Sequence, residues 1–195
     1  MNRRAILLLT GEQDSGKTSV CLRVARLLKA QRWDVAGIIS TGTFEQDMKV
    51  LISAQSLRSR ERRPLAARIP TGGTPSGPRT ERWSFDASTL AWGNAILEAA
   101  VPCEALVVDE IGPLEFTRGQ GWTSALPAVD SGGFRLALVV VRRSLLDFAL
   151  RRWPAAETHL IRQPNEIEAV ADRIVAHGMS LRTAPAVHRG NRSGD

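Results

Sequence analysis

Residues 11–18 read Gly-Glu-Gln-Asp-Ser-Gly-Lys-Thr, and they lie between a short apolar stretch and an amphipathic one. They match the pattern G-x-x-x-x-G-K-[ST] at every fixed position, which is the sequence of a loop that wraps a polyphosphate. Glycine lets backbone N–H groups converge on the anion, and a following helix adds unpaired N–H groups at the positive end of its dipole. The loop therefore requires a buried strand before it and a helix after it.

The residues of this loop have different predicted roles in binding the phosphates and Mg²⁺. Lys17 supplies a mobile cation for the outer phosphates, and the Thr18 hydroxyl is a ligand for Mg²⁺. Glu12 and Asp14 bring negative charge to an anion-binding loop, which weakens nucleotide affinity unless their side chains face solvent. The nucleotide-binding residues that we predict are Gly11, Glu12, Gln13, Asp14, Ser15, Gly16, Lys17 and Thr18.

Two acids follow a second apolar run, at residues 105–108. A phosphate loop needs a carboxylate at the tip of a neighbouring strand to hold the water shell of Mg²⁺, and Asp109 is predicted to fill that position. Glu110 is the candidate that orients or deprotonates the attacking water, so Glu110 and Lys17 are the predicted catalytic residues. Acids at strand ends are common, but together with the loop they favour hydrolysis over binding alone.

Charge accumulates on a transferred phosphoryl group, so a further cation would assist the reaction. Arg118, Arg142 and Arg143 are the candidates, and the sequence does not choose among them. The last two directly follow the apolar run at 136–141, at a strand end that faces the ligand crevice in an open α/β sheet. No Asn-Lys-x-Asp run follows that strand, so specificity for guanine is not supported.

Apolar runs alternate with amphipathic stretches along the chain, which predicts an α/β fold with a mostly parallel sheet flanked by helices. An extra β-hairpin is expected from residues 50–56 and 64–69, followed by a short strand at 83–86. We expect one domain over residues 1–179, a flexible Pro/Gly-rich loop at 70–81 and a disordered tail at 180–195. The other predicted strands cover residues 5–9, 35–40, 105–108, 136–141 and 158–161, and the helices cover 17–33, 86–100, 145–153 and 165–178.

Composition limits the other classes of function. The 195 residues are 43% hydrophobic and 24% charged, with no apolar run as long as a membrane span, so we expect a cytoplasmic protein without membrane partners. The net charge of +6 comes from scattered arginines, without the basic stripe and aromatics of a nucleic-acid interface. Two cysteines and three histidines lack the spacing of a zinc site, and Cys21 is predicted to be a buried thiol. The oligomeric state is left open.

With the loop and the segment Val-Val-Asp-Glu-Ile-Gly-Pro-Leu-Glu at 107–115 in view, the chain resembles the THEP1-type nucleoside-triphosphatase family over residues 5–178. The resemblance implies a RecA-like P-loop NTPase core that hydrolyses ATP, GTP and other triphosphates with little base preference. It also implies Lys17 and Thr18 on the phosphates and Mg²⁺, Asp109 at the metal, and Glu110 as the catalytic carboxylate. This chain departs from the family pattern in its acidic phosphate loop, its insertion around residues 70–80 and its Arg-rich tail.

Three functions remain open from the sequence. The first is hydrolysis of nucleoside triphosphates to the diphosphate and phosphate. The second is a nucleotide or small-molecule kinase on the same fold, which needs an Arg-bearing lid that only the loop at 70–82 could supply. The third is a nucleotide-responsive binding protein in cofactor or complex assembly, in which hydrolysis is slow and partner contact matters.

Overall fold

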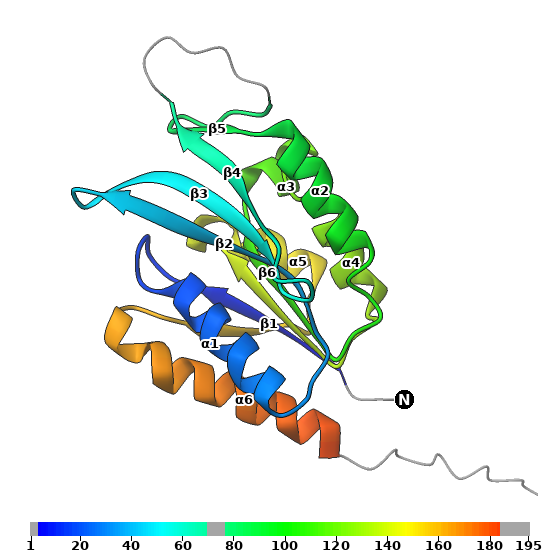
Figure 1. Cartoon of the computed structure of the whole chain (residues 1–195). Helices are drawn as coiled ribbons and strands as arrows, with labels where there is room; N and C mark the ends of the chain where they lie inside the picture. The colour runs from blue at the N-terminus through cyan, green and yellow to red at the C-terminus, as the bar shows by residue number, and fades with distance from the viewer. Residues whose placement is uncertain (1–3, 70–76, 184–195) are drawn as a thin grey trace, which may run out of the picture.

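A sheet with a parallel centre runs through the molecule where the sequence has its apolar runs (Figure 1). The computed structural model describes residues 4–69 and 77–183, and within them one sheet has eight strands in the order β5-β4-β3-β2-β6-β7-β1-β8. The strands are β1 (Ala5–Thr10), β2 (Val35–Glu45), β3 (Met48–Ser56), β4 (Arg62–Arg68), β5 (Trp83–Phe85), β6 (Ala105–Ile111), β7 (Leu136–Val141) and β8 (Glu157–Leu160).

Strands β2, β6, β7, β1 and β8 are parallel, which confirms the predicted fold class. Strand β7 is the central strand of this set, and all six of its residues are buried. A parallel strand covered on both faces is apolar throughout, so its sequence Leu-Ala-Leu-Val-Val-Val has no polar alternation. Strand β8 forms the far edge of the sheet, as predicted for residues 158–161.

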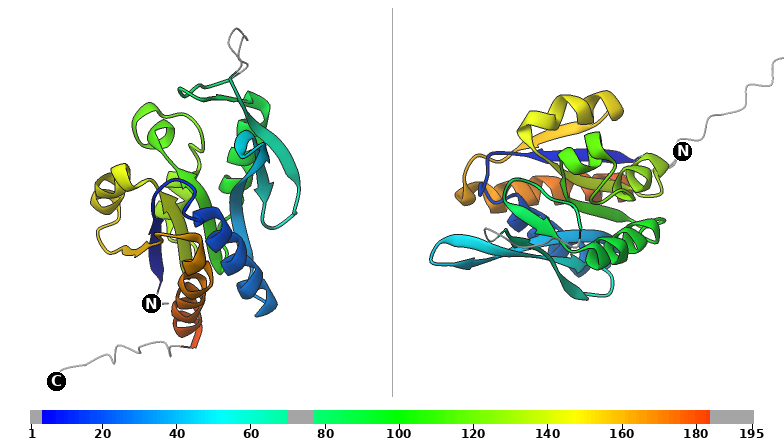
Figure 2. Two further views of the ribbon diagram at one scale, coloured as in Figure 1. Left: turned by 90° about the vertical axis from the view of Figure 1, so that its left-hand side faces the viewer. Right: turned by 90° about the horizontal axis from the view of Figure 1, so that it is seen from above.

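Helices cover both faces of the sheet. Helix α1 (Lys17–Ala30) packs beside α6 (Ile167–Thr183) on one face (Figure 2). The other face carries α2 (Ala87–Glu98), α3 (Pro113–Arg118), α4 (Ala125–Ser131) and α5 (Leu146–Arg152) (Figure 1). Successive residues of β1 serve the two faces: Leu7 and Leu9 pack in the core under α1 and α6, whereas Leu8 packs in the core on the opposite side.

The predicted hairpin is present as β3 and β4, but it belongs to a longer antiparallel extension of the sheet. Strand β2 continues to Glu45, five residues past the predicted end, and pairs with β3 as a hairpin of its own. Gln46 and Asp47 between them have φ values of 47° and 62°, the left-handed conformation of tight hairpin turns. The second half of β2 was not predicted because it carries polar residues such as Thr41 and Thr43, which lie where the strand leaves the core.

The last helix differs from its prediction at both ends. It begins at Ile167 after a 3₁₀ turn, and the predicted capping box of Asn165 and Glu168 is not formed. Instead Glu166 accepts a hydrogen bond from the Arg162 backbone N–H at 2.8 Å, and Glu168 pairs with Arg23 of α1 at 2.9 Å.

At its other end this helix continues to Thr183, so residues 180–183 belong to the fold rather than to the predicted tail. Leu181 packs against the core, and Arg182 donates to the Gln31 carbonyl at 2.9 Å while its guanidinium lies over the Trp33 ring. Residues 184–195 of the predicted tail lie outside the described residues. Among the residues that are described, no helix is long and apolar enough to cross a membrane.

The predicted flexible loop at 70–81 is described only from residue 77 onward. Residues 77–81 are hydrogen-bonded to the short strand that follows: the Phe85 N–H donates to the Pro78 carbonyl, and the Thr80 N–H donates to the Trp83 carbonyl, each at 3.0 Å. This part of the predicted loop is therefore a turn against β5. Asp86 caps the next helix, as predicted, and accepts from the Thr89 N–H at 2.7 Å.

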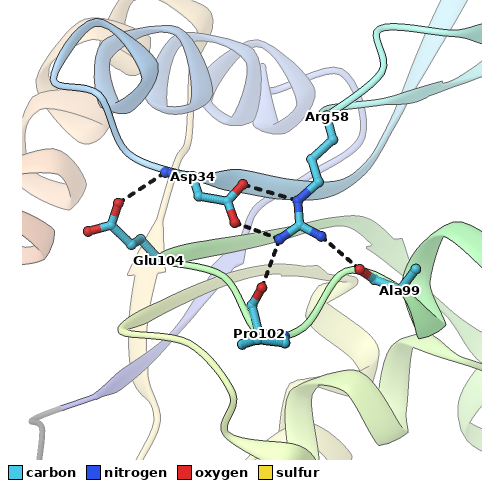
Figure 3. A network of polar contacts seen from close by, with 5 residues as sticks. All are labelled: Asp34, Arg58, Ala99, Pro102 and Glu104. Atoms are coloured by element: carbon cyan, nitrogen blue, oxygen red, sulfur yellow. Dashed lines mark hydrogen bonds and ion pairs between the residues drawn. The ribbon is translucent and has the colours of Figure 1, made fainter.

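Arg58, in the turn between β3 and β4, joins the antiparallel extension to the parallel core (Figure 3). Its guanidinium makes a two-pronged contact with the Asp34 carboxylate, with Nε at 3.0 Å and Nη2 at 2.5 Å. It also donates to the carbonyls of Ala99 at 2.7 Å and Pro102 at 2.8 Å. One side chain thus connects the approach to β2 with the segment between α2 and β6.

We expect Arg58→Ala to lower the free energy of unfolding by about 1–2 kcal/mol, because two carbonyls and a carboxylate lose a charged donor at a partly exposed site. Urea unfolding followed by circular dichroism measures the difference. Arg26→Ala is the matched control, since Arg26 is an exposed arginine on α1. An Arg58 variant as stable as the control would show that the network does not stabilise the fold.

Candidate active site

The predicted phosphate loop lies at the carboxyl end of β1 and leads into α1, whose first residue is Lys17. Strands β6 and β7 end on the same side, because they are parallel to β1. The Lys17 ammonium donates to the carbonyls of Gly11 at 3.0 Å and Glu12 at 2.6 Å, so its side chain folds back over the loop. An open α/β sheet binds its ligand at this end of the strands.

Both fixed glycines of the loop are required by close packing. A Cβ on Gly11 would lie 2.2 Å from the Ile161 carbonyl oxygen, and one on Gly16 would lie 2.9 Å from the Ile167 side chain. Gly16 also has a φ of 103°, in the left-handed region that side chains other than glycine rarely adopt. The segment after β8 and the start of α6 therefore hold the loop from behind.

Asp109 lies at the predicted position beside Thr18 and is 2% exposed. The Asp109 carboxylate accepts hydrogen bonds from the Thr18 hydroxyl and from the Ser40 N–H, the latter at 3.3 Å. The Ser40 hydroxyl donates to the backbone carbonyl of Asp109 at 2.8 Å. Burial raises the pKa of Asp109 to about 7, in spite of these hydrogen bonds. Ser40 was not predicted from the sequence, because a serine at a strand end carries no distinguishing pattern.

Glu110 directly follows Asp109, and its side chain is 32% exposed. Its carboxylate accepts a hydrogen bond from Nε of Arg142, the residue after β7. The carboxylate thus reaches the surface of the site, whereas that of Asp109 is buried. The two acids present different chemistry: the buried carboxylate of Asp109 is suited to hold a cation, and the more exposed one of Glu110 to accept a proton from water.

Glu115, the last residue of the 107–115 segment, has a structural role: it holds the nearby backbone. Its largely buried carboxylate accepts from the Gly112 N–H at 2.7 Å and from the Trp122 N–H at 2.8 Å. Burial raises its pKa, and the two backbone hydrogen bonds oppose that shift. Glu115 therefore fixes the backbone that follows the acidic strand end. A short helix, α3, begins at Pro113, where the apolar residues are too few to show the helical period that would predict one.

The acids of the phosphate loop are paired with cations from other elements. Glu12 contacts Arg143 at 3.0 Å, and Asp14 contacts Lys49 of β3 at 3.5 Å. The side chains of Glu12 and Asp14 are mostly exposed and face solvent, the condition under which their charge opposes nucleotide binding least. Of the three candidate arginines, Arg142 and Arg143 thus contact residues of the site, while Arg118 donates to the Arg79 carbonyl at 3.5 Å.

The residues at the strand tip fit a magnesium ion. The Thr18 hydroxyl and Asp109 carboxylate are hydrogen-bonded to each other and supply only oxygen, the ligand that Mg²⁺ prefers. A buried carboxylate with a raised pKa is also stabilised in its charged form by a nearby cation. Within residues 4–69 and 77–183, no group of three or more His, Cys, Asp or Glu is placed to hold a metal. The remaining ligands would come from water and phosphate.

A cavity of about 510 Å³ lies elsewhere, and its lining residues precede strands rather than follow them. They include Asp34, Glu104 and Arg135, which stand before β2, β6 and β7. Cys103 also lines it, and burial raises the pKa of this thiol to about 12, so it stays protonated at neutral pH. This cavity is therefore separate from the candidate active site, whose predicted chemical groups gather at the opposite ends of the strands.

A family model described as NTPase matches residues 6–163 of the chain. The chain belongs to this NTPase family. It is 31% identical over 139 residues to the nucleoside-triphosphatase THEP1 of Thermofilum pendens, across 70% of this chain and 74% of the relative. It is 26% identical over 180 residues to the THEP1 of Thermococcus kodakarensis, across 90% and 97% of the two chains.

The NTPase family fold is also seen in a solved structure of a human cancer-related nucleoside triphosphatase. That structure superposes with a TM-score of 0.65 at 19% identity, over 91% of this chain and 98% of that one. The resemblance to THEP1-type nucleoside-triphosphatases and the P-loop NTPase fold that it implied are therefore confirmed.

The raised pKa of Asp109 predicts a pH dependence of stability in metal-free protein. The unfolded chain releases this proton near pH 4, and the folded protein holds it until about pH 7. Folding is therefore disfavoured progressively as pH rises through that window. We expect Asp109→Asn to be more stable than the wild type at pH 8 in EDTA, with the difference shrinking toward pH 5.

Urea unfolding at several pH values in EDTA tests this expectation. Asp47→Asn is the matched control, because Asp47 is exposed in a hairpin turn whose φ of 62° suits asparagine. A difference between Asp109→Asn and wild type that does not change with pH would contradict the assignment.

Proposed function

We propose that this protein is a Mg²⁺-dependent hydrolase that converts nucleoside triphosphates to the diphosphate and phosphate, with little preference for the base. The observation that carries the proposal is the meeting of the two predicted motifs. The start of α1, with Lys17 and Thr18, lies against the β6 tip, with Asp109 and Glu110. Membership of a family whose relatives are named nucleoside-triphosphatases supports the same reaction.

The backbone of residues 11–18 surrounds the outer phosphates, and Lys17 exchanges its two carbonyl contacts for phosphate oxygens. Thr18 and Asp109 hold Mg²⁺, which when bound neutralises charge on the phosphate oxygens. Glu110 is the proton acceptor for the attacking water, because its carboxylate is at the surface of the site. Asp109 stays buried and is not available to that water.

Lys17→Ala is expected to abolish measurable nucleotide binding, because the outer phosphates lose their cation. Titration with a fluorescent ATP analogue measures the loss, and a thermal unfolding curve like that of the wild type shows that the variant is folded. Retention of wild-type affinity would be incompatible with the assignment of residues 11–18 as the nucleotide site.

Glu110→Gln is expected to bind ATP normally but to release phosphate at least about 100-fold more slowly, since the amide keeps the size and loses the basicity of the carboxylate. Steady-state phosphate release gives kcat and KM separately. Asp147→Asn, at an exposed position on α5, is the control for loss of an acidic side chain. Turnover of Glu110→Gln at the wild-type rate would remove Glu110 from the reaction.

One set of assays tests both the metal requirement and the base preference: phosphate release is measured from four nucleotides, with Mg²⁺ and in EDTA. We expect phosphate release from ATP, GTP, CTP and UTP with Mg²⁺, with rates within about tenfold of one another, and none in EDTA. Added acceptor nucleosides and sugars should give no phosphorylated product. Transfer of phosphate to such an acceptor would identify a kinase, and full activity in EDTA would exclude a role for the metal.

A further inference from the structure

Arg142 lies where β7 ends beside the acidic tip of β6. The two strands are paired so that Ile111 stands opposite Val141, which brings the residue after β7 alongside the end of β6. Nε of Arg142 donates to Oε1 of Glu110 across this boundary. The contact therefore follows from the register of the sheet, and it joins a side chain from one strand end to the predicted catalytic carboxylate of the next.

The Arg142 side chain also lies near the backbone that follows Glu110. A Cβ added to Gly112 would lie 3.8 Å from Nε and 4.0 Å from Cζ of Arg142, which is ordinary contact distance. Gly112 is itself held by Glu115, which accepts a hydrogen bond from its N–H and another from the Trp122 N–H. Arg142 thus holds one oxygen of Glu110 beside a segment of backbone that Glu115 fixes.

We propose that Arg142 is a positioning residue, which orients the Glu110 carboxylate toward the attacking water and acts on the reaction through that carboxylate. The proposal rests on the proposed function, in which Glu110 accepts the water proton. A general base is effective only within a narrow range of distance and direction, so a carboxylate free to rotate is a poorer catalyst. With one oxygen held by Arg142, the second oxygen has a defined direction.

Direct contact of Arg142 with the phosphoryl group is the competing role for such an arginine. The structure favours positioning, because Nε of Arg142 donates to the Glu110 carboxylate. Arg143, the next residue, is paired with Glu12 of the phosphate loop instead. The Arg142 side chain is 54% exposed, so the ion pair contributes little to stability and its loss should leave the fold intact.

A double-mutant cycle between Arg142 and Glu110 separates the two roles. Hydrolysis of radiolabelled ATP is followed in single turnovers with enzyme in excess, so that slow variants are measurable. Arg142→Gln is expected to slow hydrolysis by about tenfold, and to change the dissociation constant for ATP by less than about threefold. Arg142→Lys should recover part of that rate, because an ammonium group can still reach Glu110. In the Glu110→Gln background, Arg142→Gln should cause no further loss.

Other outcomes overturn the proposal. A further loss of about tenfold from Arg142→Gln in the Glu110→Gln background would mean that the arginine acts on the substrate itself. A wild-type rate for Arg142→Gln would mean that it has no part in the reaction. Arg151→Ala, an exposed arginine on α5 whose guanidinium lies over Phe148, is the matched control and should keep the wild-type rate.

Failure of the proposed function gives a different result. In that case the wild type itself releases no phosphate, or Glu110→Gln alone hydrolyses at the wild-type rate. Neither result depends on Arg142. Circular dichroism melting curves for each variant, compared with that of Arg151→Ala, show whether a loss of rate comes from unfolding.

Discussion

The site depends on a carboxylate that is buried at the meeting point of a strand tip and a helix start. Removing a carboxylate from water is unfavourable unless it is protonated, hydrogen-bonded or paired with a cation. At Asp109 the fold supplies hydrogen bonds from Thr18 and Ser40, and these leave the pKa raised to about 7. The ionised Asp109 carboxylate therefore remains unfavourable in the metal-free protein, and a cation bound beside it would offset that cost. A binding site of this kind reduces the stability of the empty protein and gains it back with ligand.

Around this carboxylate, each element is held by a neighbour that is distant in sequence. Ile161, which follows the last strand, and Ile167, which begins the last helix, close the back of the phosphate loop so tightly that only glycine fits at positions 11 and 16. Ser40 of β2 binds both the backbone and the side chain of Asp109. The phosphate loop and the acidic tip are therefore positioned by the parallel sheet as a whole, whose strand ends converge on one side.

The segment after β6 shows how a short sequence can set the geometry of a site without touching the substrate. Glu115 holds the backbone N–H groups of Gly112 and Trp122, so the chain leaves the strand tip along a fixed path. Arg142, which directly follows the neighbouring strand β7, holds Glu110 at the start of that path. The acidic character of the phosphate loop has a related explanation, because Arg143 and Lys49 pair with its two acids and offset their charge.

The sequence by itself determined the fold class and the family, and it predicted the residues of the candidate site. The strands over residues 5–9 and 136–141 were predictable because buried parallel strands are apolar throughout, and the glycine, lysine and threonine of the loop have fixed spacing set by phosphate geometry. Only the tertiary structure decided the reach of β2, the end of α6 and the partners of Ser40, Glu115 and Arg142. Those features come from contacts between residues far apart in the chain, such as Arg182 with Gln31. The local periodicity of the sequence does not predict such contacts.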